Sequence, residues 1–390
     1  MSRITVCKAD TCVGCNACVN ICSRNAIHII DDCINLNAII DTKKCINCGL
    51  CKKVCQQNNM PLYHKPIAWY QGWANDEKTR IMSSSGGFAS AVAYHCLDNG
   101  YSVYACSFYN GLLMYRKILN KSDFYNCIGS KYVKSDTAKT YREIREELSS
   151  SHKVLFIGLP CHVSGLKLFI GEKYLDNLIT IDLICHGTSS IKLFNKYLSE
   201  KNVDSKKINN ISFRQKAKCF PSREKGKFEY WLHPFLDGLT YTKNCYDCKF
   251  ARLERVSDIT IGDSWGSSLD LCEKNKGISL VLCNTAKGDM LAHSIDFRLE
   301  KVDLEVAVNN NRQLHQPSVK PVNRDLFVKT FRRLNNYHKA VKKCYKIKII
   351  KNRFNQTKIG KLRKIILRKK DSVTDVQITY VEEISLLYED

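Results

Sequence analysis

The chain has 390 residues, 44% of them hydrophobic, so it is long enough for two or three domains with buried cores. No run approaches the roughly 18 apolar residues of a membrane-spanning helix, and Met1-Ser2-Arg3-Ile4 lacks the apolar segment of a signal peptide. We therefore expect a cytoplasmic protein. The formal net charge is +23, but residues 326–370 hold 17 Lys or Arg and no acid, which leaves 44 basic against 38 acidic residues elsewhere. This distribution excludes a uniformly basic surface.

The chain contains 21 cysteines, and an odd number without an export signal argues against a disulfide framework. In a reducing compartment, clustered thiols are better explained as metal ligands. Twelve of them lie in ligand-like settings. We interpret the other nine mostly as small buried hydrophobic residues: Cys7, Cys33, Cys96, Cys106, Cys127, Cys219, Cys272, Cys283 and Cys344.

Eight cysteines form two runs of identical spacing, Cys12-x2-Cys15-x2-Cys18-x3-Cys22 and Cys45-x2-Cys48-x2-Cys51-x3-Cys55. Two-residue spacers let the backbone curl around a cubane, while the fourth cysteine lies on the next helical turn and reaches the other cluster. We therefore predict a bacterial-type ferredoxin domain with two 4Fe–4S clusters over residues 1–60. One cluster takes Cys12, Cys15, Cys18 and Cys55, and the other takes Cys45, Cys48, Cys51 and Cys22.

Zinc is the alternative metal for these runs. Zinc sites commonly use two separated cysteine pairs, however, and the runs fit that pattern poorly. One departure from the bacterial ferredoxin pattern follows the fourth cysteine of each run, where Ser23 and Gln56 stand in place of the usual proline. The change weakens local rigidity but removes no ligand.

A connector with Pro61 and Pro66 as breakers leads to a serine–glycine turn, Ser83-Ser84-Ser85-Gly86-Gly87-Phe88, and then to an apolar run over residues 89–97. We expect this turn to open a helix. Free amides and hydroxyls at a helix start can bind an anion, and a serine there can equally be a simple N-cap. The sequence leaves both interpretations open.

From Lys153 onward, short apolar runs at 154–157, 178–184, 259–261 and 279–282 alternate with helical patterns. This alternation predicts a mixed α/β domain with parallel strands. Ligands gather beyond the carboxyl ends of such strands, where Cys161 and Cys185 lie, and Cys245 and Cys248 add a Cys-x2-Cys pair. Four thiols suit a cubane or zinc, and spacing alone does not choose between these and unconnected thiols.

Several short segments then stand in a characteristic order: 83–88, Gly129-Ser130-Lys131-Tyr132-Val133, 158–166, 182–187, 245–249 and 257–266. In this combination the chain resembles the beta-subunit family of coenzyme F420 (deazaflavin) hydrogenases and dehydrogenases over about residues 5–310. It departs from the family at Leu159, where Thr is usual, and at His162, where Gln is usual.

The resemblance implies a flavoprotein with an iron–sulfur cluster in its body. It favours a third 4Fe–4S cluster on Cys161, Cys185, Cys245 and Cys248, and flavin (FAD) or substrate contacts at Ser84, Ser85, Gly86, Gly87 and Lys131. The expected fold is α/β (α+β overall). Residues 1–60 form the ferredoxin-like two-cluster domain, 61–150 and 151–325 the two parts of a mixed α/β flavin and iron–sulfur body, and 326–390 a basic helical tail.

The activity that the resemblance implies is an oxidoreductase. Electrons would pass from ferredoxin, or from a hydrogenase or dehydrogenase subunit, through the clusters to FAD and on to a two-electron acceptor. That acceptor would be the deazaflavin coenzyme or an organic substrate, since many bacterial members look like parts of surface-polysaccharide pathways. The alternative is a non-enzymatic electron carrier serving a separate reductase, and a redox-sensing regulator with its tail on DNA is a third hypothesis.

Three further residues have two interpretations each. His186 would donate a proton, or simply hydrogen-bond a cluster sulfur or the backbone. Asp263 and Trp265 would line the flavin site, or close a loop. We assign no catalytic acid.

The basic segment shows apolar residues at near-helical spacing, in two sets: Phe331, Leu334, Val341 and Tyr345, then Ile359, Leu362, Ile365 and Ile366. A basic amphipathic pattern can lie on an anionic membrane surface, here the inner face of the cytoplasmic membrane. It can equally pack on the body or dock an acidic partner. Few aromatic residues interleave the charges, so no nucleic acid is expected as a partner.

Overall fold

The computed structural model describes residues 4–208, 211–216, 218–219 and 229–346. The chain divides into two compact units, one of residues Met1–Lys218 and Thr240–Val319 and the other of Cys219–Leu239 and Lys320–Asp390. The predicted second set of apolar tail residues, Ile359, Leu362, Ile365 and Ile366, lies outside the described residues. Within the described part of the chain, no helix is long and apolar enough to cross a membrane.

The N-terminal segment is small and ferredoxin-like, as predicted. Strands β1 (Ile27–Asp31) and β2 (Leu36–Ile40) pair antiparallel, and each cysteine run contains a short helix, α1 (Ala17–Ile21) or α2 (Leu50–Lys53). These elements enclose a core of apolar residues and thiols that includes Val6, Leu36 and Ala38. Much of the space between them is therefore occupied by cysteine side chains rather than by aliphatic ones.

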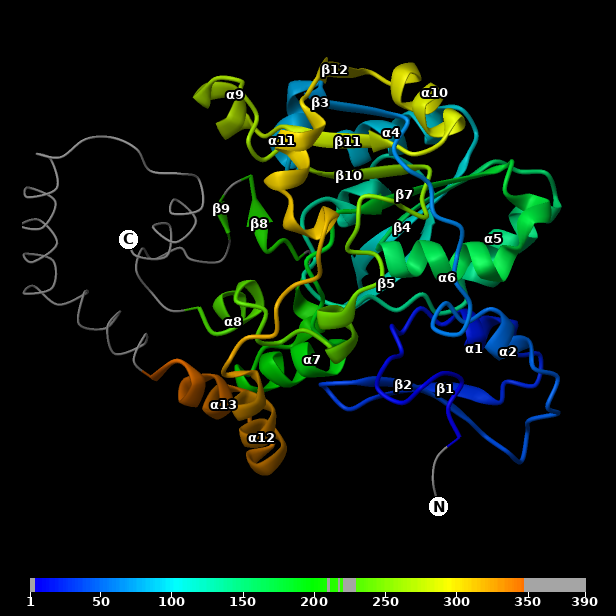
Figure 1. Cartoon of the computed structure of the whole chain (residues 1–390), viewed down its shortest axis with the longest axis vertical. Helices are drawn as coiled ribbons and strands as arrows, with labels where there is room; N and C mark the ends of the chain where they lie inside the picture. Colours follow the sequence, from blue (N-terminus) through cyan, green and yellow to red (C-terminus); the bar gives the residue numbers. More distant parts are fainter. Residues whose placement is uncertain (1–3, 209–210, 217, 220–228, 347–390) are drawn as a thin grey trace, which may run out of the picture. The chain divides into compact units, whose positions relative to one another are not determined.

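The body is built on one mixed sheet of eight strands in the order β12-β3-β11-β10-β7-β6-β4-β5 (Figure 1). Neighbours among β4, β6, β7 and β10 run parallel, and the outer strands run antiparallel. The predicted mixed α/β class with parallel strands is confirmed. The bounds are β3 Ala68–Ala74, β4 Ser102–Tyr109, β5 Leu112–Ile118, β6 Val154–Gly158, β7 Leu178–Leu183, β10 Ile259–Asp263, β11 Ser279–Cys283 and β12 Phe297–Lys301. Strands β8 (Arg214–Gln215) and β9 (Lys218–Cys219) are much shorter.

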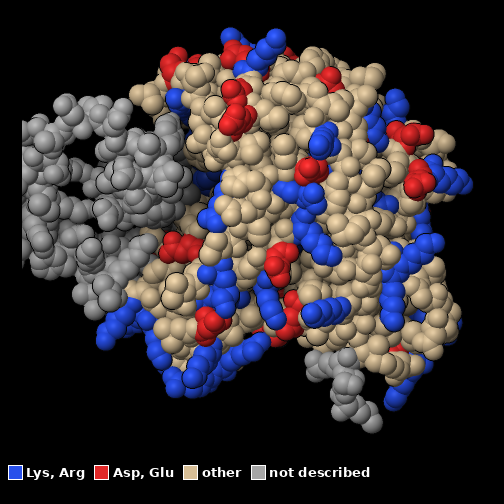
Figure 2. All heavy atoms as spheres, in the orientation of Figure 1, with Lys and Arg blue, Asp and Glu red and all other residues tan. Residues whose placement is uncertain are grey.

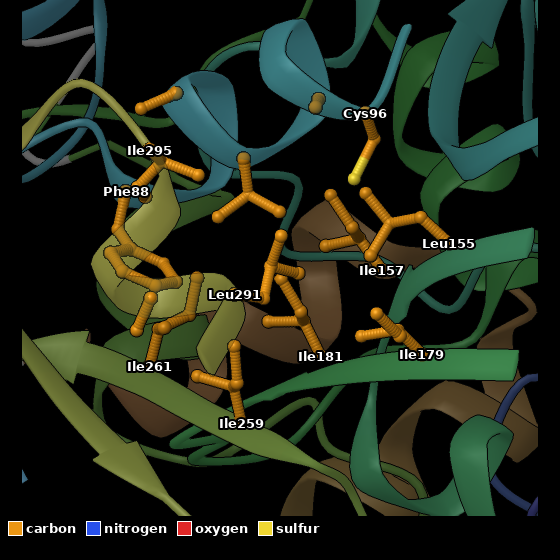
Figure 3. Close-up of a cluster of buried hydrophobic side chains, with 14 of the residues drawn as sticks. Phe88, Cys96, Leu155, Ile157, Ile179, Ile181, Ile259, Ile261, Leu291 and Ile295 are labelled. Atoms are coloured by element: carbon orange, nitrogen blue, oxygen red, sulfur yellow. The ribbon is translucent and has the colours of Figure 1, made fainter. Parts of the chain in front are cut away.

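Helices cover both faces of this sheet, which explains why β6 and β11 are buried along their whole length. On one face, Phe88 and Cys96 of α4 (Phe88–Asp98) and Leu291 of α10 (Ala286–Ser294) pack on β-strand residues such as Ile181 and Ile259 (Figure 3). The remaining helices of this unit are α3 Glu77–Met82, α5 Thr140–Ser149, α6 Pro160–Ile170, α7 Ile191–Glu200, α9 Leu271–Lys276 and α11 Leu304–Asn309. Short 3-10 helices occur at η1 Asp123–Cys127, η2 Glu172–Tyr174, η3 Ser205–Lys207, η4 Lys243–Asp247 and η5 Arg312–Leu314.

The opposite face of the sheet joins the body to the N-terminal segment. Tyr141 of α5 and Leu166 of α6 pack on Phe156 of β6, and the same buried cluster includes Cys15 and Val54 from the cysteine runs. The two parts of this unit thus share one hydrophobic core. The N-terminal thiols are held against α6 by the same burial that stabilises the sheet.

The second unit contains α8 (Leu232–Leu236), α12 (Arg324–Leu334) and α13 (Tyr337–Cys344). Phe331, Val341 and Tyr345, which the sequence placed on a possible membrane-binding face, are buried at 5%, 0% and 6% exposure, whereas Leu334 is 43% exposed. Lys and Arg side chains gather on the surface of α12 and α13 (Figure 2). In the described part of the tail, the apolar stripe is therefore used for packing.

Candidate metal centres

The first cysteine run curls because two of its residues have left-handed backbone conformations. Gly14 has a φ of 70° and Asn16 a φ of 58°, so the chain turns tightly between Cys12 and α1. The Gly14 amide donates a hydrogen bond to Cys12 Sγ at 3.4 Å. Hydrogen bonds from backbone amides to sulfur are one of the means by which a protein tunes the reduction potential of a cluster. The four thiols assigned to this group, Cys12, Cys15, Cys18 and Cys55, are all buried.

The second run repeats this geometry at the same offsets. Asn47 has a φ of 56° and Gly49 a φ of 75°, and the Asn47 amide donates to Cys45 Sγ at 3.4 Å. The main difference lies in exposure, because Cys48 is exposed whereas the first group is buried. The second group therefore lies at the surface of the protein.

The charges of neighbouring cysteines affect the pKa values of thiols in both runs. Burial raises the pKa of Cys51, and the neighbouring charges that raise it further are those of Cys45, Cys48 and Cys22. Burial likewise raises the pKa of Cys18, and the charges of Cys15, Cys55, Cys51 and Cys7 raise it further. The crossed assignment of Cys22 and Cys55 stays a prediction. Ligation of iron by these groups stays a prediction.

Parallel strands β6 and β7 bring two body cysteines to one edge of the sheet. Gly158 at the end of β6 pairs with Asp182 of β7, so the segments that follow both strands leave the sheet side by side. Cys161 then lies in the first turn of α6, and Cys185 follows the end of β7. With η4 adding the Cys-x2-Cys pair, one recess is lined by Cys161, Cys185, Cys245 and Cys248, together with Lys134 and His186.

Lys134 places a positive charge beside these four thiols. The residue is 6% exposed, and its Nζ lies 3.8 Å from Cys161 Sγ. Burial by itself would lower the pKa of this ammonium, but the charges of the four body thiols raise it. A buried cation needs a compensating anion, and a thiolate-bound cluster would supply one.

The spacing of the thiols also bears on the choice between zinc and a cluster. In the described residues, no group of three His, Cys, Asp or Glu side chains is placed to hold one metal ion. A tetrahedral zinc site with Zn–S bonds of about 2.3 Å brings its sulfurs to within about 4 Å of one another. A cubane holds its cysteine sulfurs farther apart, because four irons lie between them. Which of the two metal centres these four cysteines hold stays a prediction, because both are bound by four cysteine sulfurs.

The first N-terminal group lies directly against the body group. A Cβ at Gly165 of α6 would lie only 2.8 Å from Cys15 Sγ, and the charge of Cys161 contributes to the raised pKa of Cys15, after burial. Gln56, in place of the usual proline, is 1% exposed and donates from Nε2 to the Cys161 carbonyl at 2.6 Å. The three thiol groups thus follow one another from exposed Cys48 to the partly buried recess.

His186 and Asp263 have settled partners. Burial lowers the pKa of His186, and Asp263 opposes that effect. The carbonyl of His186 accepts a bond from Ser318 Oγ at 2.6 Å. Asp263 forms a two-point ion pair with Arg214, with N–O distances of 2.7 Å, and Trp265 is half-buried. These contacts favour the structural interpretation of Asp263.

The serine–glycine turn opens α4 as expected, but its serines do not cap the helix. Gly87 is the N-cap, with a φ of 96° and no side-chain cap bond. Ser84 Oγ donates to the Arg214 carbonyl at 3.3 Å, and Ser85 Oγ donates to the carbonyl of Ile278, just before β11, at 2.9 Å. Two cations border the turn, since Arg214 and Lys216 donate to the carbonyls of Ser84 and Ser85 at 3.0 and 2.8 Å.

Lys131, the other predicted flavin contact, is bound to the backbone. Its Nζ donates to the carbonyls of Cys127, Ile128 and Gly129 at 3.1, 2.8 and 3.3 Å. Burial lowers its pKa, against the opposing effect of nearby thiols. In this conformation the ammonium stabilises the end of η1, and a flavin contact stays a prediction.

Three residues near the centres were not anticipated from the sequence. Besides Lys134, Cys7 is buried, and its raised pKa is affected by Cys12 and Cys55. His162 Nδ1 lies 2.9 Å from Tyr115 Oη, while its Nε2 has no hydrogen-bond partner in the described structure. The available signals were weak: Lys134 follows the Gly129–Val133 segment, and His162 is a departure from the family pattern.

Comparison with known proteins bears on the body and on the N-terminal segment. Residues 151–305 match the family model for the carboxy-terminal part of the beta subunit of coenzyme F420 hydrogenase/dehydrogenase, and residues 38–59 match that for a 4Fe–4S binding domain. No curated protein matches the chain. A chain from the xenon-derivatized F420-reducing NiFe hydrogenase complex of Methanosarcina barkeri is 17% identical, with a TM-score of 0.43 over 64% of this chain and 91% of that one. The first family match spans all four body cysteines and the second spans the second cysteine run.

Proposed function

We infer that this chain is an iron–sulfur flavoprotein oxidoreductase. Its residues 38–59 match a 4Fe–4S binding domain, and its residues 151–305 match the C-terminal part of the coenzyme F420 hydrogenase/dehydrogenase beta subunit. The chain passes electrons between a ferredoxin-type donor and a two-electron acceptor. The observation that carries this proposal is the series of three thiol groups, which extends from the surface at Cys48 to the recess beside Lys134. A protein that only stored iron would not need such a series.

Each thiol group would hold one 4Fe–4S cluster. Bound clusters exchange single electrons, and bound FAD converts single-electron into two-electron chemistry. The chain's own contribution is to space, bury and charge-balance these groups. The core around Cys15 and α6 excludes water between the first group and the body recess, and Lys134 offsets negative charge in that recess. The domain limits 1–60, 61–150, 151–325 and 326–390 are part of this proposal.

The serine–glycine turn is the proposed flavin site. It begins α4, a helix of 11 residues, and helix starts favour phosphate. Lys216 at its border adds positive charge, as the diphosphate of FAD would require, whereas the charge of Arg214 is offset by its ion pair with Asp263. We propose the deazaflavin coenzyme or an organic substrate, including one of surface-polysaccharide synthesis, as the acceptor.

A second function, that of a non-enzymatic electron carrier, is favoured by a different observation. The hydroxyls of Ser84 and Ser85 and the ammonium of Lys131 all donate to backbone carbonyls of the chain itself. Under this hypothesis the body relays electrons to a separate reductase and binds no flavin.

The deciding experiment measures the content of iron, acid-labile sulfide and flavin in protein purified without oxygen. We expect about twelve iron, twelve sulfide and one FAD per chain. About eight iron without flavin would overturn the body-cluster and flavin proposals and leave the ferredoxin domain. Twelve iron without flavin would make the electron carrier the better description. Anaerobic turnover of the deazaflavin coenzyme by the flavin-loaded protein would then identify the acceptor class.

A further inference from the structure

The surface around the second thiol group combines apolar and basic side chains. Beside exposed Cys48, Ile46 and Leu50 are 62% and 45% exposed, and Met60 farther along is 60% exposed. Isolated exposed apolar residues are common on proteins. Here they lie on the loop and helix that carry the most accessible thiols of the chain's N-terminal series, so their position requires an explanation.

The same segment carries four exposed lysines. Lys43, Lys44, Lys52 and Lys53 are all exposed, and the only acid between residues 41 and 60 is Asp41. Asp41 lies 3.9 Å from Lys44 and offsets only part of this charge. A shallow groove is lined by Lys8, Lys52 and Lys53 and extends to Cys7. The face therefore combines an excess of positive charge with exposed apolar side chains.

We propose that this face, residues 43–53 with Lys8, is the docking surface for a small acidic electron-carrier protein. The inference rests on the proposed function, because it assumes that the second thiol group holds a redox cluster. Each docking event moves one electron: the carrier is oxidised by one electron and the cluster is reduced by one, or the reverse, and no proton is required. Charge complementarity speeds the encounter, and the few exposed apolar side chains allow a transient complex.

An anionic membrane surface would meet the same lysines, but the structure favours a protein partner. The helix in this face, α2, has only four residues, which is too short for an amphipathic helix to lie in a bilayer interface. Electron transfer to the second thiol group also requires a partner whose own redox centre can come close to that group. Lipid binding is therefore an outcome of the test and not the proposal.

The test uses the full chain with its clusters, a reduced acidic bacterial ferredoxin as the probe, and stopped-flow absorbance. The variant Lys52→Glu/Lys53→Glu reverses two charges on α2. The matched control, Lys206→Glu/Lys207→Glu, reverses the charges of two consecutive exposed lysines on η3. We expect the second-order rate constant to fall about tenfold or more at low salt in the α2 variant and to stay within about twofold of the parent in the control. The parent rate should also fall as ionic strength rises.

Equal rates in the parent and the α2 variant, or an equal loss in the control, would overturn the proposal. So would binding of the parent to vesicles of anionic lipid that is lost in the α2 variant while the ferredoxin rate is unchanged. Reduction by dithionite, a small anion that needs no protein docking surface, is measured in parallel to show that the clusters are intact. Because reduction of the N-terminal clusters is observed directly, a chain without flavin still reports on docking, and failure of the proposed function remains distinguishable.

Discussion

Lys134 Nζ lies 3.8 Å from Cys161 Sγ in a recess that three further cysteines share. A buried ammonium group therefore lies beside a predicted cluster ligand. A positive charge close to a redox centre stabilises the reduced, more negative form, and burial strengthens that effect because the local dielectric is low. Lys134 should therefore raise the reduction potential of the body cluster.

Lys134→Met removes this charge while keeping a side chain of similar length. We expect the potential of the body cluster to fall on the order of 100 mV, as measured by a redox titration followed by electron paramagnetic resonance. Lys134→Arg keeps the charge and should retain most of the parent potential. Iron content should be unchanged in both variants. A parent-like potential in Lys134→Met would show that the charge does not act on the cluster.

Cys161→Ser or Cys245→Ser should each lose about four iron per chain, because each removes one predicted ligand of the body cubane. The eight N-terminal cysteines are untouched, so about eight iron should remain. Cys283→Ser is the matched control, since Cys283 is also buried but lies within β11 and outside the three thiol groups. Loss of zinc with unchanged iron would contradict the assignment of the body site.

Gly165→Ala tests the contact between α6 and the first cysteine run. Alanine normally stabilises a helix interior by up to about 1 kcal/mol relative to glycine. Here the added Cβ would lie 2.8 Å from Cys15 Sγ and 3.0 Å from Cys15 Cβ, so overpacking should instead lower the free energy of unfolding by about 1–3 kcal/mol. Thermal unfolding of the anaerobic protein measures the change. An unchanged or increased unfolding midpoint would mean that α6 and the first cysteine run can move apart to accommodate the methyl group without loss of stability.

Asp258 should make the fold sensitive to acid. It is buried between Lys167 and Lys287, at 3.8 and 3.5 Å, and accepts bonds from the amide and hydroxyl of Thr180. Burial raises the pKa of Asp258, but the two lysines and Thr180 outweigh burial and hold it below its ordinary value. A carboxyl with a depressed folded-state pKa stabilises the fold above its unfolded-state pKa, and that contribution is lost as pH falls through the folded-state value.

Asp258→Asn should therefore lower the free energy of unfolding by about 3 kcal/mol at pH 7. The difference from the parent should shrink as pH falls below about 4. Denaturant unfolding at several pH values measures both effects, with the exposed Asp176→Asn as the control. A difference that stays constant down to about pH 3 would show that another group carries the acid sensitivity.

Features that depend on local spacing could be predicted from the amino-acid sequence. The two cysteine runs define their own loops, since left-handed residues such as Gly14 and Gly49 lie between ligands only a few positions apart. The alternation of apolar runs and helical patterns was likewise enough to predict β6, β7, β10 and β11 and the α/β class, because periodicity is a property of short segments.

How distant segments meet could be learned only from the folded chain. The register of β6 with β7 brings Cys161 close to Cys185, and the packing of α6 places Gly165 against Cys15. The buried position of Lys134 and the burial of Val341 were equally beyond prediction. Each depends on contacts between residues far apart in the chain, and no local pattern encodes which buried surface a given side chain will face.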